Sequence, residues 1–389
     1  MDKIKKREKT SNSAAWYRKA DLDDNPSRLS EIIVILLCAM LVFSNIAFGA
    51  VETWALGFLS LFAALIVIFW IADAWLKKEF WFSFSKLQLP LLGLILIGLI
   101  QLLPLRSSNV SSDLLSISAS SSLSLDPFLT QIAVVHLIIY FIFFAAALTF
   151  INIQNRLRKI VVAIVIFGAL MAFFGILQRL AGVEGIYGLR PTPQAIPFSS
   201  YVNQHHFAAF LEMTIGLTLG LLFGKATNKD KRFLLVIAAV LMGIAIVLTS
   251  SRGGMLSLFG VLAFVITANL LKNQKDENKS STENRQNFRR NFTLIAGGLT
   301  LVLGLFGAVI LLGGDASLLR GVGLTTTQDL SSGRTHFWYV ALQVFVNNPI
   351  LGVGLDAFGT AFTRFDTWNG TFRVEQAHND YLQILADAG

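Results

Sequence analysis

The stretch that decides the fold is residues 54–76, WALGFLSLFAALIVIFWIADAWL. Asp73 is the only charged side chain in it. About 20 apolar residues in a row are enough for a helix to cross the hydrocarbon core of a bilayer. This stretch therefore predicts a transmembrane helix.

Apolar runs of similar length recur along the chain. They lie near residues 32–51, 87–105, 129–151, 159–181, 207–224, 233–249, 254–271 and 292–313. Of the 389 residues, 54% are hydrophobic and only 14% are charged, which is too apolar for a soluble domain. We expect an all-α, polytopic bundle of about nine transmembrane helices.

This pattern predicts three regions. Residues 1–31 form a cytoplasmic tail and residues 32–313 form the transmembrane bundle. Residues 314–389 form a large extracytoplasmic loop of short helices, which runs into a further helix at its C-terminal end.

The distribution of basic residues predicts the orientation. Of the 32 Lys and Arg residues, 24 fall in the N-terminal tail and in alternate loops, and the other eight, on the opposite side, are all Arg. Cytoplasmic loops carry the excess of Lys and Arg. We therefore expect a cytoplasmic N-terminus and place 314–389 on the outer side. The net charge of +8 then reflects topology, and we expect no nucleic-acid partner.

Few residues are suited to holding a metal or a nucleotide. Cys38 is the single cysteine, which excludes a cysteine cluster. The one D-x-D motif, Asp21-Leu22-Asp23, lies in the predicted cytoplasmic tail, and no GxxxxGK[ST] motif occurs. We expect no cofactor and no metal.

Two outer segments carry candidate binding residues. The segment 180–206 contains Arg190 and ends in Asn203-Gln204-His205-His206 at the mouth of the sixth predicted span. Asn203 and His206 either cap that helix at the interface or contact a substrate, and Arg190 is a candidate for binding an anionic group. Arg252, in the turn 249–254 (TSSRGG), is either a topological anchor or a seat for an anion.

The longest outer segment predicts a helix that Ser331 or Ser332 caps and that runs through about residue 345. Its apolar face suits a helix lying at the membrane interface: Phe337, Trp338, Ala341, Leu342 and Phe345. Asn347-Asn348-Pro349 ends this helix. Gly352, Gly354 and Gly359 then allow tight turns.

Several motifs together resemble the O-antigen ligase and polymerase superfamily. They are YVNQHHFA (201–208), SSRGG (250–254), SGR (332–334) followed by Trp338, NPILGVG (348–354) and AHNDYLQILADAG (377–389). The resemblance implies a membrane glycosyltransferase of surface polysaccharide or lipopolysaccharide biosynthesis in the bacterial inner membrane. Its donor would be a glycan on undecaprenyl diphosphate. Its acceptor would be a hydroxyl of a glycolipid, a glycan or a protein on the periplasmic side.

The resemblance also implies roles for three residues, Arg252, Arg334 and His378. The two arginines would stabilise the charge that develops on the leaving diphosphate. A histidine, with an unperturbed pKa of about 6.5, can take the proton from the acceptor hydroxyl. Asn379, Asp380 and Tyr381 follow His378, and if His378 begins a helix, Tyr381 at i+3 would face it. These three are predicted to bind substrate.

Two other classes of function remain open. A transporter or flippase of lipid-linked or small substrates would place ionisable residues inside its spans, whereas Asp73 and Glu212 lie at or near span ends. A structural subunit of an envelope complex would leave Arg252, Arg334 and His378 scattered. A transferase would bring them to one cavity at the outer membrane surface.

Overall fold

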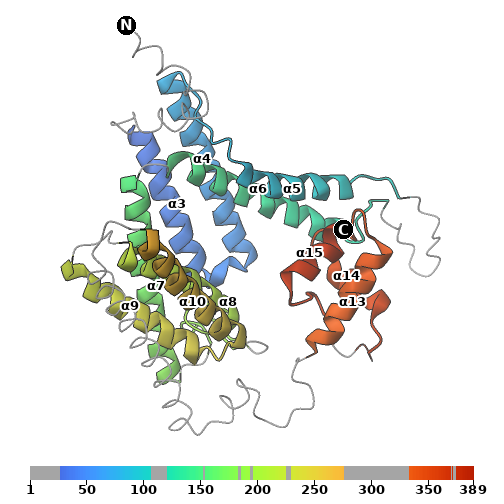
Figure 1. The fold of residues 1–389 in the computed structure, drawn as a ribbon. Coiled ribbons are helices and arrows are strands. Elements are labelled where there is room, and N and C mark those ends of the chain that lie inside the picture. Colours follow the sequence, from blue (N-terminus) through green and yellow to red (C-terminus); the bar gives the residue numbers. More distant parts are fainter. Residues whose placement is uncertain are drawn as a thin grey trace, which may run out of the picture. The chain divides into compact units, whose positions relative to one another are not determined.

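The computed structural model describes residues 27–106, 121–151, 154–182, 185–192, 196–224, 229–275, 333–368, 370 and 374–389 (Figure 1). Within these ranges the chain is helical, and its extended pairing amounts to two isolated bridges, Ile186–Arg190 and Phe198–Tyr201. The predicted all-α class is confirmed.

Six helices among the described residues are long and apolar enough to cross a membrane. They are α3 (Arg28–Ile46), α4 (Thr53–Lys77), α6 (Pro127–Phe150), α7 (Gln154–Leu180), α8 (Gln204–Phe223) and the part Lys231–Leu248 of α9 (Lys229–Leu248). Two shorter apolar helices are Lys86–Gln101, which comprises η2 (Lys86–Gln88) and α5 (Leu89–Gln101), and Gly253–Val265 in α10 (Arg252–Lys275). These helices match eight of the nine predicted runs. The ninth run, 292–313, and residues 1–26 of the predicted tail lie outside the described residues.

The described helices belong to two compact units. The first unit comprises residues 1–37, 58–152 and 328–389, and the second comprises residues 38–57 and 153–327. The second unit contains the short helix η1 (Phe48–Ala50) and the helices α7 to α10.

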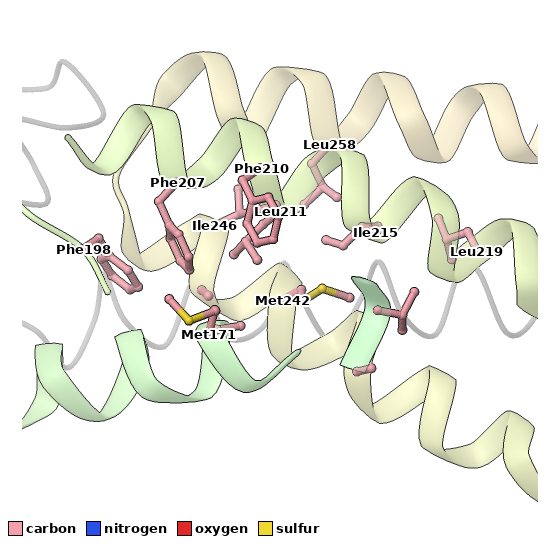
Figure 2. Packing of buried hydrophobic residues seen from close by; sticks show 14 of the residues in the cluster. Met171, Phe198, Phe207, Phe210, Leu211, Ile215, Leu219, Met242, Ile246 and Leu258 are labelled. Carbon is pink, nitrogen blue, oxygen red and sulfur yellow. The ribbon is translucent and has the colours of Figure 1, made fainter. Parts of the chain in front are cut away.

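An apolar core joins the four long helices of the second unit. Figure 2 shows labelled side chains of this core pointing toward one another, and they include Met171, Phe207, Leu211, Met242 and Leu258. Phe198, which precedes α8, stacks on Phe207 with ring centroids 5.4 Å apart. This stack packs the loop before α8 onto the core.

Small residues let the helices of the second unit approach closely. A Cβ placed on Gly168 of α7 would lie 2.5 Å from Thr214 Cγ2 of α8. A Cβ on Gly175 would lie 2.5 Å from Phe198 Cε1. Helices in membranes pack largely through such close backbone contacts, because lipid already solvates their apolar side chains.

In the first unit, α5 packs along α6 and against α15 (Asp380–Ala388). The start of α6 is defined by sequence: Pro127 is its first residue, and Asp126 Oδ1 accepts a hydrogen bond from the Leu129 N–H at 3.1 Å. Proline fits this position because the first helical N–H has no partner within the helix.

The C-terminal module, which we define as the described residues from 333 to 389, contains α13 (Arg334–Asn347), α14 (Phe358–Phe365) and α15. These helices share a buried core of Val340, Ala341, Val344, Val353, Ala357, Phe358, Ala361, Phe362, Val374, Ala377 and Ala386. The residues of the predicted apolar face of α13 divide between two environments. Ala341 is buried and Phe337 packs against the core, but Trp338 and Leu342 are exposed. The buried face follows positions 337, 340, 341 and 344, because α14 and α15 cover that side.

The buried side-chain amide of Gln101, at the end of α5, connects α5 to the C-terminal module. Its Nε2 donates to the carbonyls of Leu351 and Asp387, at 2.6 and 2.7 Å. Its Oε1 accepts from the Leu355 N–H at 2.9 Å. Thr130 of α6 donates to the Leu355 carbonyl at 2.9 Å. The loop that follows α13 is therefore held by two apolar helices.

Two glycines allow this loop to approach its neighbours. Gly352 and Gly354 have φ angles of +58° and +117°, which confirms the predicted tight turns at these positions. A Cβ on Gly352 would lie 2.3 Å from the backbone of Asp387. A Cβ on Gly354 would lie 2.1 Å from Ser124 Oγ and 2.8 Å from Thr130 Oγ1. The GVG sequence is thus a packing motif here.

We expect Gly354→Ala to lower the free energy of unfolding by about 2–4 kcal/mol, because overpacking costs about 1–3 kcal/mol and left-handed backbone about 1 kcal/mol more. Gly370→Ala is the matched control. Gly370 also has a positive φ, +69°, but a Cβ there meets nothing within 4 Å. Thermal unfolding in detergent measures the stability of both variants. Equal losses of stability in the two would contradict the packing role of Gly354.

A second buried group, the Asp387 carboxyl, lies beside this loop. Its Oδ2 accepts from the Asp356 N–H at 3.1 Å and from Gln383 Nε2 at 2.9 Å, whereas Oδ1 is buried without a partner. Burial raises the pKa of Asp387 to about 7. The folded protein therefore retains a proton that the unfolded chain releases above about pH 4.

Stability should fall as pH rises from about 4 to about 7 and stay low above that range, because the folded state binds the extra proton across this window. Asp387→Asn should remove this dependence and raise the free energy of unfolding at pH 8 by up to about 4 kcal/mol. Asn still offers one oxygen for the two hydrogen bonds. Melting temperatures at pH 5 and pH 8 test this, and parallel pH curves for wild type and variant would refute it.

Candidate functional site

Arg334 is the first residue of α13, in the first unit. Its N-cap residue is Gly333, with a φ of +82°, whose carbonyl accepts from the N–H groups of His336 and Phe337 at 3.1 and 3.2 Å. Ser331 and Ser332, the predicted caps of this helix, lie outside the described residues. The Arg334 side chain is exposed. A helix N-terminus with an exposed arginine favours an anion there.

His378 lies two residues before α15, in a left-handed backbone conformation with a φ of +51°. The residues on either side hold this turn. The Ala377 N–H donates to Gln383 Oε1 at 2.8 Å, and Asn379 Oδ1 accepts from the N–H groups of Tyr381 and Leu382 at 3.1 and 3.3 Å. The His378 imidazole is presented on a fixed turn, and it is exposed.

His378 contacts an aromatic ring of the helix that Arg334 begins. The His378 ring lies 5.9 Å from the ring of Phe337, centroid to centroid, and Phe337 is one helical turn after Arg334. The structure therefore brings His378 to the first turn of α13. Two of the three predicted catalytic residues thus belong to one end of the C-terminal module.

The neighbours of His378 take positions that differ from the prediction. The helix begins at Asp380, so the i+3 relation between His378 and Tyr381 does not apply. Asn379 is the N-cap of α15 and uses its side-chain oxygen for that role. Asp380 and Tyr381 are exposed on the first turn of α15. Substrate contact by these three residues remains a prediction.

Sequence reasoning missed a second histidine beside this site. His336 Nε2 lies 2.8 Å from Asp366 Oδ1, and both side chains are 12% exposed. The His336 ring stacks on Trp368, with centroids 4.2 Å apart and an interplanar angle of 9°. The Trp368 N–H also donates to Asp366 Oδ1 at 3.0 Å. The only signal in the sequence is that His336 lies between SGR and Trp338.

The hydrogen bonds to Asp366 set its charge. The Trp368 N–H, then His336, lower the pKa of the Asp366 carboxyl below its usual value. An ionised carboxylate beside an imidazole stabilises the tautomer with hydrogen on Nε2 and also the imidazolium form. Asp366 therefore holds the orientation of the His336 ring.

Arg252, the third predicted catalytic residue, begins α10 in the second unit. Ser251 caps this helix, and its Oγ accepts from the Gly254 N–H at 3.1 Å. Ser250 has a φ of +52°, so the turn before Arg252 is tight. Both predicted arginines are thus first residues of helices. The convergence of Arg252 with Arg334 and His378 remains a prediction.

Glu212 contributes a carboxylate to the same turn of the second unit. It lies well inside α8, not at a span end as predicted. A Cβ placed on Gly254 would be 3.1 Å from Glu212 Oε1, so the carboxylate lies against the first turn of α10. An acidic residue inside an apolar helix is the sequence signal that marks such a position.

The other predicted binding residues also lie in the second unit. Arg190 forms an ion pair with Glu52, and its guanidinium carbon lies 5.2 Å from the centroid of the Phe48 ring. Asn203 is the N-cap of α8, where its side chain accepts from the His205 N–H at 2.9 Å. His206 is exposed on the first turn of that helix. The capping alternative is therefore confirmed for Asn203.

The described parts of the chain contain no group of three or more His, Cys, Asp or Glu residues placed to hold a metal ion. Metal independence remains a prediction, because other residues and ligands contributed by a substrate are not covered by this finding.

Comparison with protein families gives one match. Residues 237–389 match the family described as O-antigen ligase. This region contains the C-terminal module and the turn that carries Arg252. No curated protein and no solved structure matches the chain in the corresponding comparisons. The family match confirms the resemblance drawn from the motifs.

The His336–Asp366 pair generates a double-mutant test. His336→Phe removes the bond to Asp366 but keeps a ring for stacking on Trp368, and Asp366→Asn removes the charge. Each should lower the melting temperature at pH 7 by a few degrees. The melting temperature of the double variant should fall by less than the sum of the two single decreases, because both substitutions remove the same interaction.

The decrease in melting temperature caused by Asp366→Asn should be full above about pH 4. It should disappear as the pH falls through the lowered pKa of Asp366, because this carboxyl is then protonated in wild type as well. Additive losses, or a loss independent of pH, would show that the pair does not contribute as an ionised unit. Thermal unfolding between pH 3 and pH 8 provides both readings.

Proposed function

Because residues 237–389 form an O-antigen ligase domain of a multi-pass membrane protein, we propose a specific glycan-transfer reaction for it. The enzyme transfers a glycan from an undecaprenyl-diphosphate carrier to an acceptor hydroxyl on the outer side of the bacterial inner membrane. The observation that carries the proposal is the position of His378 against Phe337, one turn along the helix that Arg334 begins. This position supports a base at His378 close to a diphosphate site at the start of α13.

The proposed step is a displacement at the anomeric carbon of the sugar that is linked to the diphosphate. The acceptor oxygen forms a new bond to this carbon, and the bond from the carbon to the diphosphate oxygen breaks. The hydroxyl proton passes to the His378 imidazole. Undecaprenyl diphosphate leaves with the bonding electron pair, so no oxidant, nucleotide or further reactant is needed.

Arg334 and the first turn of α13 act on the leaving group in this proposal. The guanidinium forks onto phosphate oxygens, and the helix terminus adds partial positive charge. Both interactions strengthen as negative charge develops on the diphosphate, which is the condition for accelerating the reaction. Arg252 begins a helix in the same way and is proposed as the second arginine that binds the diphosphate.

The distribution of basic residues supports an outer active face. The C-terminal module follows the predicted ninth span, and the eight basic residues assigned to its side of the membrane are all arginine. A glycan diphosphate already carries its leaving group, so we propose that transfer requires no metal and no cofactor. The acceptor is a hydroxyl of a glycolipid, a glycan or a protein.

Transfer from a purified undecaprenyl-diphosphate glycan to these three kinds of acceptor tests the proposal, with the full chain in detergent and a chelator present. His378→Asn should lower the rate about 10²–10⁴-fold by removing the base. Asn tolerates the left-handed backbone of this position, so the turn should persist. Arg334→Lys keeps the charge but loses the fork and should lower the rate about 10²-fold.

Arg364→Ala is the matched control, because Arg364 is an exposed arginine at the end of α14 in the same module. Its rate should equal that of wild type. A wild-type rate in His378→Asn would remove the base from the mechanism. Movement of the lipid-linked glycan across vesicles without transfer to any acceptor would instead favour a flippase.

A further inference from the structure

Trp368 is an exposed aromatic residue that is held in one orientation. It is 47% exposed, although one face of its indole is covered by the His336 ring at 4.2 Å. Its backbone N–H is bound by Asp366, and its ring meets Phe337 edge to face, with centroids 5.8 Å apart and an angle of 62°. The contacts with Asp366, His336 and Phe337 thus fix the orientation of the Trp368 indole, which remains accessible to a ligand.

The indole lies at the end of α13 where the diphosphate is proposed to bind. A Cβ placed on Gly333, the N-cap of α13, would lie 3.0 Å from Trp368 Cη2. The six-membered ring of the indole therefore borders the residue that precedes Arg334. Phe337 contacts both Trp368 and His378. The Phe337 ring therefore lies between the Trp368 indole and the candidate base His378, near the N-terminus of α13.

A flat aromatic face at this place suits a sugar. The C–H bonds on one side of a pyranose ring carry partial positive charge, and the face of an aromatic ring is the negative part of its quadrupole. Stacking therefore orients the sugar and leaves its hydroxyls free for hydrogen bonds with neighbouring polar groups. In a polyprenyl-diphosphate glycan, the first sugar is bonded directly to the diphosphate.

The polar surroundings argue against a role of Trp368 as a membrane anchor alone. Tryptophans at a membrane interface sit among headgroups by virtue of their own amphipathic rings. Here the indole is stacked on a histidine that is paired with an ionised carboxylate. Burying that carboxylate in acyl chains would be costly.

We propose that the exposed face of Trp368 binds the pyranose ring attached to the diphosphate of the donor. His336 and Asp366 act as positioning residues that hold the indole flat. This inference rests on the proposed function, because it names the part of the donor that the site contacts. The indole fixes the first sugar between the diphosphate at the start of α13 and the base at His378.

The test compares two ligands, the undecaprenyl-diphosphate glycan and sugar-free undecaprenyl diphosphate, for binding to the full chain in detergent. Trp368→Ala should weaken binding of the glycan-bearing lipid about tenfold, comparable to the loss of one aromatic stacking contact. It should leave the affinity for the sugar-free lipid unchanged. Trp368→Phe keeps a smaller aromatic face and should give an intermediate loss.

Trp75→Ala is the control, since Trp75 is an exposed tryptophan of α4, outside the C-terminal module. It should bind both lipids as wild type does. Equal weakening of both lipids in Trp368→Ala, or the same loss in Trp75→Ala, would overturn the inference in favour of general membrane contact. Unchanged binding in Trp368→Ala would overturn it as well.

The outcomes separate this inference from the proposed function. If wild type shows no preference for either lipid and no transfer, the proposed function fails. Wild type could bind the donor and transfer its glycan while Trp368→Ala and Trp368→Phe bind the donor equally well. In that case only the proposed sugar contact of Trp368 fails. Thermal unfolding of each variant establishes that the comparison is made on folded protein.

Discussion

The C-terminal module depends on one buried amide, the side chain of Gln101. It uses both of its N–H donors on the carbonyls of Leu351 and Asp387 and its oxygen on the N–H of Leu355. A buried polar group is costly unless its hydrogen bonds are made, and here the amide makes three. The loop after α13 and the end of α15 are therefore bound to the same residue of an apolar helix.

This arrangement supports the candidate site from the opposite end of the helices that carry it. Gln101 holds the end of α15 and the loop that follows α13. Arg334 begins α13 and His378 precedes α15, so both lie at the opposite, N-terminal ends of these helices. The core between α13, α14 and α15 combines small residues with the buried rings of Phe358 and Phe362, and it is closely packed. The functional side chains then lie on short, fixed turns at helix starts. Rigid support of this kind is what a site needs to hold reacting groups in place.

The sequence predicted those features that local chemistry decides. Apolar runs of sufficient length indicated the spans, Asn347-Asn348-Pro349 marked the end of α13, and Gly352 and Gly354 marked tight turns. Each of these depends on a few consecutive residues. The family motifs placed Arg334 and His378 in one region because the order of motifs carries information that single residues do not.

Long-range pairings could not be predicted in this way. His336 and Asp366 are separated by a helix, a loop and a second helix, and nothing in the composition around them marks a pair. The partners of Gln101 are more than 200 residues away in the chain, so nothing in its local sequence marks them. The apolar residues of α13 that α14 and α15 cover could not be told apart in the sequence, because Trp338 and Leu342 are as hydrophobic as they are.

The two histidines of the module have different surroundings, and this difference bears on the roles proposed for them. A base for the acceptor hydroxyl must be reached by a molecule that arrives from water or lipid. His378 is exposed on a turn held by Asn379 and Gln383. His336 has one nitrogen engaged by Asp366 and one face covered by Trp368. This difference favours His378 as the base in the proposed reaction, and His336 as support for the surface on which the sugar is proposed to lie.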